Sequence, residues 1–376
     1  SMRVNILTKG FLSPTSRGWL HPLVKNKSRL SEMGIDLTFY FKNHEEVKFC
    51  DVVIVESRFV FKDWRDNKSK IFDLLSSLKT KNNKVFYYDL GDSTYSWGLE
   101  ALPYVDKLLK PFIFKDKNNY CVPLRGFTII TDYYYKKGII DRYEPLPHKI
   151  LPMTPNFLAQ KDKHLLDKIQ VGFNSAFADH GINSNLWSYD YINRLTRKSF
   201  KAYSKMLNST KAFEYINPES SRTQDLSCRF LSDGYSSGID FHRKETAKIL
   251  SKFISTNKLD RKDYFAEMRN SKIVVSPFGW GEINVPRDYE VALSGSVLLK
   301  PDLSHMNTWP DIFNKETVVQ YKWDLSNLLE IVEKVIDNYD DYISFAIRLQ
   351  DQYKDYSFGE LGKERFCNYF INMIKN

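Results

Sequence analysis

One stretch, residues 271–310, restricts the fold of this chain more than any other part of the sequence. It opens with a β-branched run at 272–276, which is typical of a buried strand. A proline- and glycine-rich turn, a helix and a second strand are expected next, at 277–281, 287–293 and 296–300. Pro286 suits the first turn of that helix, and Gly295 suits its end. Two parallel strands joined by a helix are the unit of an open α/β sheet, which binds ligands at the carboxyl ends of its strands.

The rest of the chain alternates strand-like and helix-like segments, which predicts parallel, doubly wound sheets. Strands are expected at residues 3–8, 35–41, 51–56, 84–89, 169–173, 211–216 and 228–232. Helices are expected at residues 23–33, 68–80, 186–207, 241–257, 260–270, 324–338, 341–354 and 360–375. The loop at 9–22 joins the first strand to the first helix, and it lacks the G-x-G-x-x-G fingerprint of a dinucleotide site.

The length of 376 residues is too great for one ordinary core and suggests two domains. Residues 143–155 hold four prolines and are the best linker candidate, and a second α/β unit is expected to begin near Lys168. The predicted parts are residues 1–155, residues 156–345 and closing helices at 346–376. The predicted fold is therefore α/β, with two Rossmann-like doubly wound domains facing a cleft, and such clefts are common ligand sites.

The composition narrows the function classes but does not choose among them. A net charge of +9 comes from 55 Lys and Arg against 46 Asp and Glu. It fits either a solvated surface or attraction to anions such as nucleotide phosphates, anionic lipid headgroups or nucleic acid. No apolar run reaches about 18 residues and no signal-peptide pattern is present, so no membrane span is expected. Four scattered cysteines suggest reduced thiols in a cytoplasmic protein.

Two carboxylates, Glu282 and Glu290, stand in the glycine loop and the helix of the opening stretch in an E-x7-E pattern. The amides of a glycine loop and of a helix amino terminus bind phosphate well. Glu290 is then placed to accept the hydroxyls of a ribose, and Glu282 to face the reactive end of the same ligand. Basic side chains can neutralise a leaving diphosphate, and the candidates are Arg229, Arg243 and Lys300.

The E-x7-E pattern, with its preceding strand and glycine loop and the following S-G-S-V-L-L strand, resembles the carboxyl domain of retaining GT-B glycosyltransferases of a bacterial branch. The resemblance covers residues 260–330. It implies that Glu282 contacts the donor sugar, that Glu290 binds the nucleotide ribose, and that loop amides at Gly279, Trp280 and Gly281 hold sugar and phosphate. It also implies that no metal or other cofactor is needed, that the loop at 9–22 meets donor and acceptor, and that the final helix crosses back to the first domain.

Further candidates lie outside that pattern. Asp92, in the turn after the fourth strand, is a candidate base or acceptor ligand, and His305 is a candidate donor ligand. Arg17 and His21 in the first loop are candidate acceptor ligands. One departure from the family is that the early basic pair of the carboxyl domain is absent, because Asn-Ser-Ala stands at residues 174–176; Arg229 or Arg243 is the substitute.

Structural interpretations stand beside these roles. Glu282 could cap the helix, Glu290 could be a surface residue, and Trp280 could serve packing alone. Lys300 could simply end its strand. His21 could be a capping or core group, and Asp92 could serve the turn itself, since Asp is common in turns.

The leading hypothesis is a glycosyltransferase that moves a sugar from a nucleotide-sugar donor to a glycan or lipid-linked acceptor, with retention, in bacterial surface polysaccharide synthesis. The positive net charge of the chain would allow peripheral contact with the cytoplasmic membrane face. One alternative is a non-catalytic protein that binds nucleic acid or another anionic polymer; no recognition motif supports it, and no nucleic-acid partner is expected. A nucleotide-sugar epimerase of the same fold is another alternative.

Overall fold

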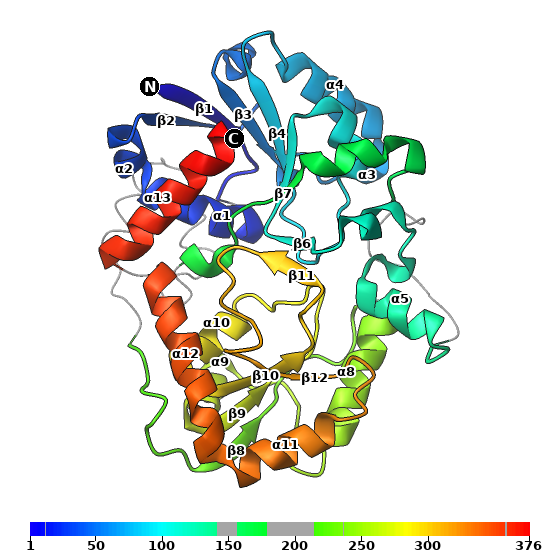
Figure 1. Ribbon diagram of the computed structural model, residues 1–376, viewed down its shortest axis with the longest axis vertical. Coiled ribbons are helices and arrows are strands. Elements are labelled where there is room, and N and C mark those ends of the chain that lie inside the picture. Colours follow the sequence, from blue (N-terminus) through cyan, green and yellow to red (C-terminus); the bar gives the residue numbers. More distant parts are fainter. Residues whose placement is uncertain (12, 141–155, 179–213, 236, 358) are drawn as a thin grey trace.

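The computed structural model describes residues 1–11, 13–140, 156–178, 214–235, 237–357 and 359–376. Two parallel β-sheets form its upper and lower halves, and helices cover the faces of both sheets (Figure 1). The predicted α/β class with two doubly wound parts is therefore confirmed. The predicted linker at 143–155 and the predicted helix at 186–207 lie outside the described residues.

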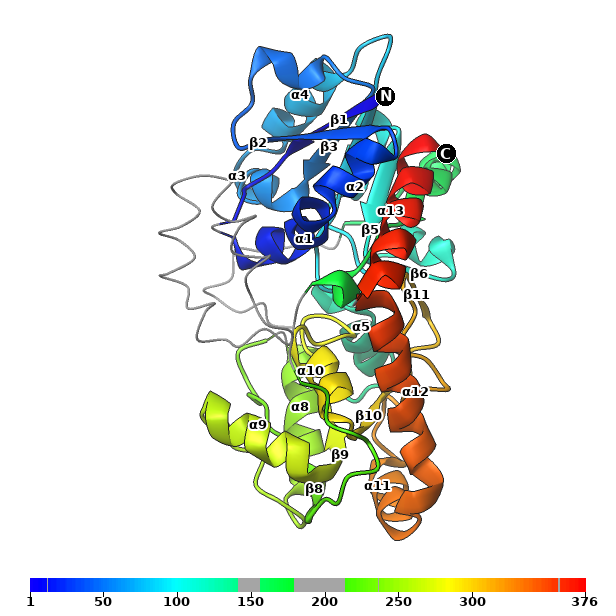
Figure 2. The same ribbon diagram turned by 90° about the vertical axis from the view of Figure 1, so that its left-hand side faces the viewer.

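The first sheet has six parallel strands in the order β2-β1-β3-β4-β5-β7. These strands are β1 (Met2–Leu7), β2 (Ile35–Tyr40), β3 (Val52–Glu56), β4 (Lys84–Tyr88), β5 (Lys107–Lys110) and β7 (Ile169–Val171). Every residue of β3 is buried, as expected for a central parallel strand with helices on both faces. One face packs against α3 (Asp63–Asp66) and α4 (Lys68–Leu78). The other packs against α1 (Pro14–Lys25), α2 (Lys27–Glu32) and α13 (Gly359–Lys375) (Figure 2).

Strand β7 corrects one prediction. Residues 169–173 were expected to open the second α/β unit, but Ile169–Val171 pairs in parallel with β5 at the edge of the first sheet. A short apolar run shows that a strand exists, but not which sheet it joins.

The second sheet has four parallel strands in the order β12-β10-β9-β8. These are β8 (Gln224–Ser227), β9 (Ser271–Val275), β10 (Val297–Pro301) and β12 (Val319–Tyr321). One face packs against α8 (Ser237–Leu250) and α11 (Leu328–Asp337), and the other against α9 (Arg261–Asn270), α10 (Arg287–Ser294) and α12 (Tyr339–Ser357). The prediction of a strand at 228–232 was wrong, because the strand is β8, just before that range. The first residues of β8 are polar, so the sequence pattern did not reveal it. The described end of the strand expected at 211–216 is not a strand either.

The stretch that restricts the fold most, residues 271–310, has the predicted order of strand, loop, helix and strand, in β9, α10 and β10. Gly295 ends α10 in the left-handed conformation, with φ of 69°, and its amide donates to the carbonyls of Val291 and Ala292. The helix and strand signals of this region are confirmed.

The first loop is shorter than predicted. Helix α1 begins at Pro14, so most of the expected loop at 9–22 is helical. Ser13 caps the helix by accepting a hydrogen bond from the Ser16 amide, and proline suits the first turn. The Ser-Pro pair was the signal that could have placed this start.

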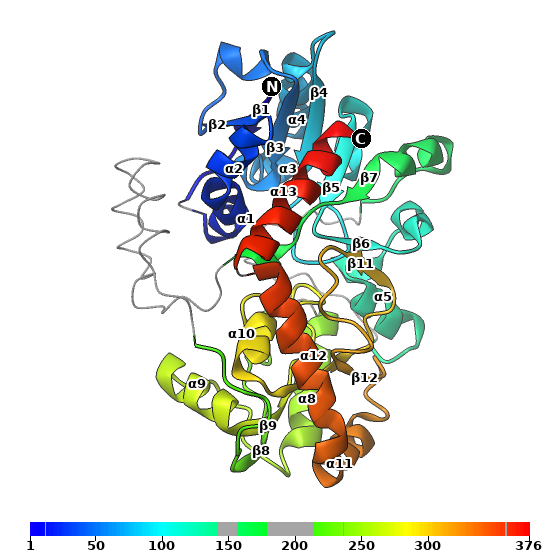
Figure 3. The ribbon, with the colours of Figure 1, turned by 60° about the vertical axis from the view of Figure 1, so that its left-hand side comes forward.

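Several contacts tie the halves of the molecule together. Strand β6 (Phe112–Phe114) pairs antiparallel with β11 (Met306–Thr308) between the two large sheets. Helix α12 lies along the lower half, and α13 continues upward onto the first sheet (Figure 3). The Lys107 ammonium donates to the Met373 carbonyl, and the Tyr369 hydroxyl donates to the Val171 carbonyl.

Candidate active site

A cavity of about 480 Å³ lies where the two halves meet. The first half contributes the start of α1, the turn after β4 and the segment after β7, and the second half contributes the start of α9 and the approach to α10. Its charged or titratable lining residues come from both halves and are Arg17, His21, Asp92 and Arg261. We call this cavity the cleft. Its volume suits a small-molecule ligand.

Asp92 is an accessible carboxylate at the wall of the cleft. Within the described part of the chain, its side chain has no hydrogen bond or ion pair. Desolvation by the surrounding protein raises the pKa of Asp92 above its ordinary value, and the charges of Arg58 and Lys110 oppose that rise. An open carboxylate with a raised pKa can accept a proton from a ligand hydroxyl.

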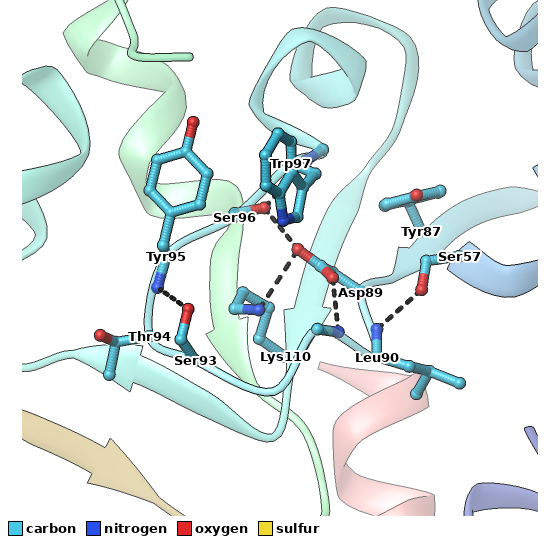
Figure 4. A network of polar contacts seen from close by, with 12 residues as sticks. Ser57, Tyr87, Asp89, Leu90, Ser93, Thr94, Tyr95, Ser96, Trp97 and Lys110 are labelled. Atoms are coloured by element: carbon cyan, nitrogen blue, oxygen red, sulfur yellow. Dashed lines mark hydrogen bonds and ion pairs between the residues drawn. The ribbon is translucent and has the colours of Figure 1, made fainter. Parts of the chain in front are cut away.

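A buried polar network holds the turn that carries Asp92 (Figure 4). Asp89 accepts hydrogen bonds from the Ser96 hydroxyl at 2.6 Å and the Gly91 amide at 2.8 Å. It also pairs with the ammonium of Lys110 at 3.2 Å, and both side chains are almost completely buried. The Leu90 amide donates to the Ser57 hydroxyl. These contacts fix the backbone before and after Asp92.

Glu282 bridges the two halves of the molecule. It accepts hydrogen bonds from the Thr94 hydroxyl at 2.6 Å and the Thr94 amide at 3.1 Å, and it contacts His305 Nε2 at 3.0 Å. Burial acts to raise the pKa of Glu282, but His305 and Thr94 outweigh it and the pKa is lowered. The structure thus brings Glu282 and His305 together, at a side chain only 4% exposed.

Glu290 lies on the buried side of α10, with 2% of its surface exposed. Its carboxylate pairs with Arg261 at 3.1 Å, and burial raises its pKa. Arg261 lines the cleft and Glu290 lies behind it. The sequence interpretation missed Arg261, although the capping Asp260 before it marks the start of α9.

The three basic residues predicted to face a diphosphate are already engaged inside the second half. Arg229 forms an ion pair with Glu267 at 2.7 Å, and Lys300 forms one with Asp288 at 2.8 Å. Arg243 donates to the carbonyls of Leu231 and Phe278 and is 2% exposed. The charges that reach the cleft are instead those of Arg17 and Arg261, so Arg17 is the predicted arginine that lies there.

The side chains of Arg243 and His242 form hydrogen bonds with the backbone of the glycine loop. The Phe278 amide donates to His242 Nε2, and the Gly279 amide donates to the Gly281 carbonyl. A Cβ on Gly281 would lie 1.7 Å from the Asp92 carbonyl oxygen, so this glycine lets the loop meet the turn after β4. Trp280 lies at the same junction, with its ring 5.3 Å from that of Tyr235.

Arg17 and His21 lie on α1 and both line the cleft, together with Asp92. Arg17 Nη1 donates to the Phe11 carbonyl at 3.2 Å. His21 is 3% exposed. The structure therefore places the two predicted acceptor ligands in the same cavity as a predicted catalytic residue, on a helix instead of the predicted loop.

Comparisons with known proteins give no match to any family model and none to a curated protein. Among solved structures, the Anabaena protein HepE in complex with UDP-glucose is similar at 9% identity and a TM-score of 0.43, over 99% of this chain and 100% of that chain. The β-glucosyltransferase of phage T4 is similar at 12% identity and a TM-score of 0.43, over 100% of both chains. A putative UDP-N-acetylglucosamine 2-epimerase from Listeria monocytogenes is similar at 12% identity and a TM-score of 0.38, over 100% of this chain and 96% of that chain.

Within the described residues, no group of three His, Cys, Asp or Glu side chains could hold a metal ion. None of the helices described is both long and apolar enough to cross a membrane.

Proposed function

We propose that the protein is a glycosyltransferase that moves a sugar from a nucleotide-sugar donor to a hydroxyl of a glycan or lipid-linked acceptor. The observation that carries the proposal is the cleft, in which cationic side chains from both α/β halves and the accessible Asp92 line one cavity. The E-x7-E pattern of the glycine loop and α10 gives it independent support.

In this proposal the nucleotide lies across the cleft, with its phosphates near Arg17 and Arg261. Guanidinium groups suit phosphate because they form paired, charge-assisted hydrogen bonds. When Arg261 turns to a phosphate, Glu290 loses that ion pair but keeps its hydrogen bond with Tyr264, and its released oxygen can accept a ribose hydroxyl. In this proposal, binding of the donor breaks the 3.1 Å ion pair between Arg261 and Glu290.

Asp92 is the proposed site of contact with the attacking hydroxyl, because it is the accessible carboxylate of the cleft. The role of Glu282 near the transferred sugar rests on the E-x7-E resemblance alone, because its side chain is buried, does not line the cleft and joins the glycine loop to Thr94. Retention, independence of a metal, a role in bacterial surface polysaccharide synthesis and peripheral membrane contact belong to the proposal as well. They rest on the E-x7-E resemblance and on the positive charge.

A thermal-shift panel of nucleoside mono- and diphosphates and their sugars tests the donor site. We expect one nucleotide to raise the melting temperature of the wild type, because a ligand that binds only the native state stabilises it. Arg261→Gln should remove most of that shift. Arg269→Gln is the matched control, since it changes the same charge at an exposed position on the same helix.

A panel in which no nucleotide shifts the melting temperature would contradict the proposal. Conversion of the nucleotide sugar into its epimer, with no acceptor added, would instead favour the epimerase alternative. Steeply salt-dependent binding to nucleic acid, without nucleotide-sugar binding, would favour the polymer-binding alternative.

A further inference from the structure

A second cavity of about 290 Å³ opens on the other side of the turn that carries Asp92. Gly91 and Asp92 line both this cavity and the cleft, so the turn is the wall between them. The second cavity lies mostly against the first half of the molecule, and Trp280 of the glycine loop closes it from the second half. We call it the aromatic pocket.

Seven of its fifteen lining residues are aromatic. The rings of Trp97 and Phe127 are 4.6 Å apart, and those of Tyr95 and Trp97 are 5.4 Å apart (Figure 4 shows Tyr95 and Trp97 beside the Asp89 network). Trp97 and Trp280 keep part of their surface exposed. Exposed aromatic faces next to hydroxyl and carboxylate groups suit a pyranose ring, whose C–H faces are apolar and whose edge is polar.

Two opposite charges of the aromatic pocket, Arg58 and Asp92, form no hydrogen bond or ion pair in the described protein, although the charge of Arg58 acts on Asp92. The guanidinium of Arg58 lies over the Phe61 ring at 4.7 Å and, among the described residues, forms no ion pair or hydrogen bond. The Asp92 carboxylate is similarly unpaired. Two other lining charges differ, because Arg65 pairs with Asp66 and Asp89 pairs with Lys110.

We infer that the aromatic pocket binds the acceptor, and that this acceptor is a pyranose carrying an anionic group. Arg58 binds the anionic group, the rings of Trp97 and Trp280 contact the sugar face, and Asp92 receives a hydroxyl at the wall shared with the cleft. The inference rests on the proposed function, since it takes the cleft to hold the donor. It departs from the sequence-based assignment, which gave the acceptor to Arg17 and His21.

The anionic group could be the carboxylate of a uronic acid or the phosphate of a sugar phosphate. A guanidinium recognises both in the same way, through paired charge-assisted hydrogen bonds. A neutral hexose would leave Arg58 without that partner, so the pocket should discriminate strongly against it.

The test is a titration of the whole protein with three probes, followed by tryptophan fluorescence: methyl β-glucuronide, glucose 6-phosphate and methyl β-glucoside. We expect at least one anionic probe to bind about tenfold more tightly than the glucoside, as a charged hydrogen bond would provide. The tighter anionic probe identifies the source of the charge. Arg58→Gln should abolish the preference, and Arg58→Lys should retain part of it.

Arg125→Gln is the matched control, because Arg125 is exposed in the same half of the molecule and lies outside the aromatic pocket. It should leave the preference unchanged. Equal binding of all three probes, or a preference that survives Arg58→Gln, would overturn the inference. A nucleotide-induced thermal shift in the same protein would then show that only the acceptor assignment had failed, whereas loss of that shift as well would reject the donor proposal.

Discussion

His242 is a single buried side chain that fixes the glycine loop through its protonation state. The Tyr134 hydroxyl donates to the Trp323 carbonyl at 2.5 Å, so in its 2.8 Å contact with His242 the donor is Nδ1–H. Nε2 then accepts from the Phe278 amide at 3.2 Å. A second proton, on Nε2, would point an N–H group at the Phe278 N–H group, and two donors cannot form a hydrogen bond. Burial, with the charges of Arg243 and Lys300, lowers the pKa of His242 to about 3.

Because of this histidine, the free energy of unfolding should decrease as the pH is lowered. Between its ordinary pKa of 6.5 and the folded value of about 3, the unfolded state binds a proton that the folded state refuses. The His242 contribution is therefore complete above pH 6.5 and is lost by about 1.4 kcal/mol per pH unit below it. In urea unfolding from pH 7.5 to 5, the stability advantage of the wild type over His242→Gln should shrink as the pH falls. Parallel curves for the two proteins would contradict the neutral tautomer.

Gly281 should tolerate no side chain, because a Cβ would overlap the Asp92 carbonyl oxygen. Gly281→Ala is expected to cost about 1–3 kcal/mol of unfolding free energy, as overpacking does. Gly18→Ala is the control, since an added Cβ at that position of α1 meets nothing within 4 Å. Equal melting temperatures for Gly281→Ala and the wild type would mean that the glycine loop does not pack against the turn as described.

Helix α13 stabilises the first sheet although it comes last in the chain. Phe366 is fully buried, and its ring lies 5.0 Å from Phe173 and 5.1 Å from Phe177. Phe366→Ala should therefore cost roughly 3–5 kcal/mol, measured by chemical unfolding. Leu361→Ala on the same helix is 51% exposed and should cost far less. Similar losses for both variants would show that α13 does not pack on the sheet through this face.

The sequence predicted elements best where local signals agreed with each other. At β9, α10 and β10, the β-branched run, Pro286 and Gly295 all marked boundaries that the structure confirms. Strand β7 was assigned to the wrong unit because Ile169–Val171 is defined by its pairing with β5, a contact between distant parts of the chain. The start of β8 is polar, and the start of α1 depended on the Ser13 cap, so hydrophobic periodicity missed both.

At the level of the whole molecule, the cleft joins parts that the sequence keeps far apart. The pattern singled out Glu282 and Glu290, but it could not show that Thr94 and Arg261 engage them. Nor could the pattern show that the side chains of Arg229, Arg243 and Lys300 bind partners within the second half. Such pairings depend on how the two sheets face each other, which no local pattern encodes.

Asp92 should separate turnover from donor binding. If it receives the proton of the acceptor hydroxyl, Asp92→Asn should lower the transfer rate by about 10²- to 10⁴-fold. The nucleotide affinity should change little. Asp73→Asn, at an exposed position on α4, is the control for loss of one charge. A transfer rate unchanged in Asp92→Asn would remove Asp92 from the reaction.

The central claim is that one nucleotide binds between the two α/β halves. A crystal structure of the protein with the nucleoside diphosphate that gives the largest thermal shift tests it most directly. We predict phosphates within hydrogen-bond distance of Arg17 or Arg261, and a ribose at Glu290 with the contact between Arg261 and Glu290 broken. A nucleotide bound outside the cleft, with that ion pair intact, would contradict the account.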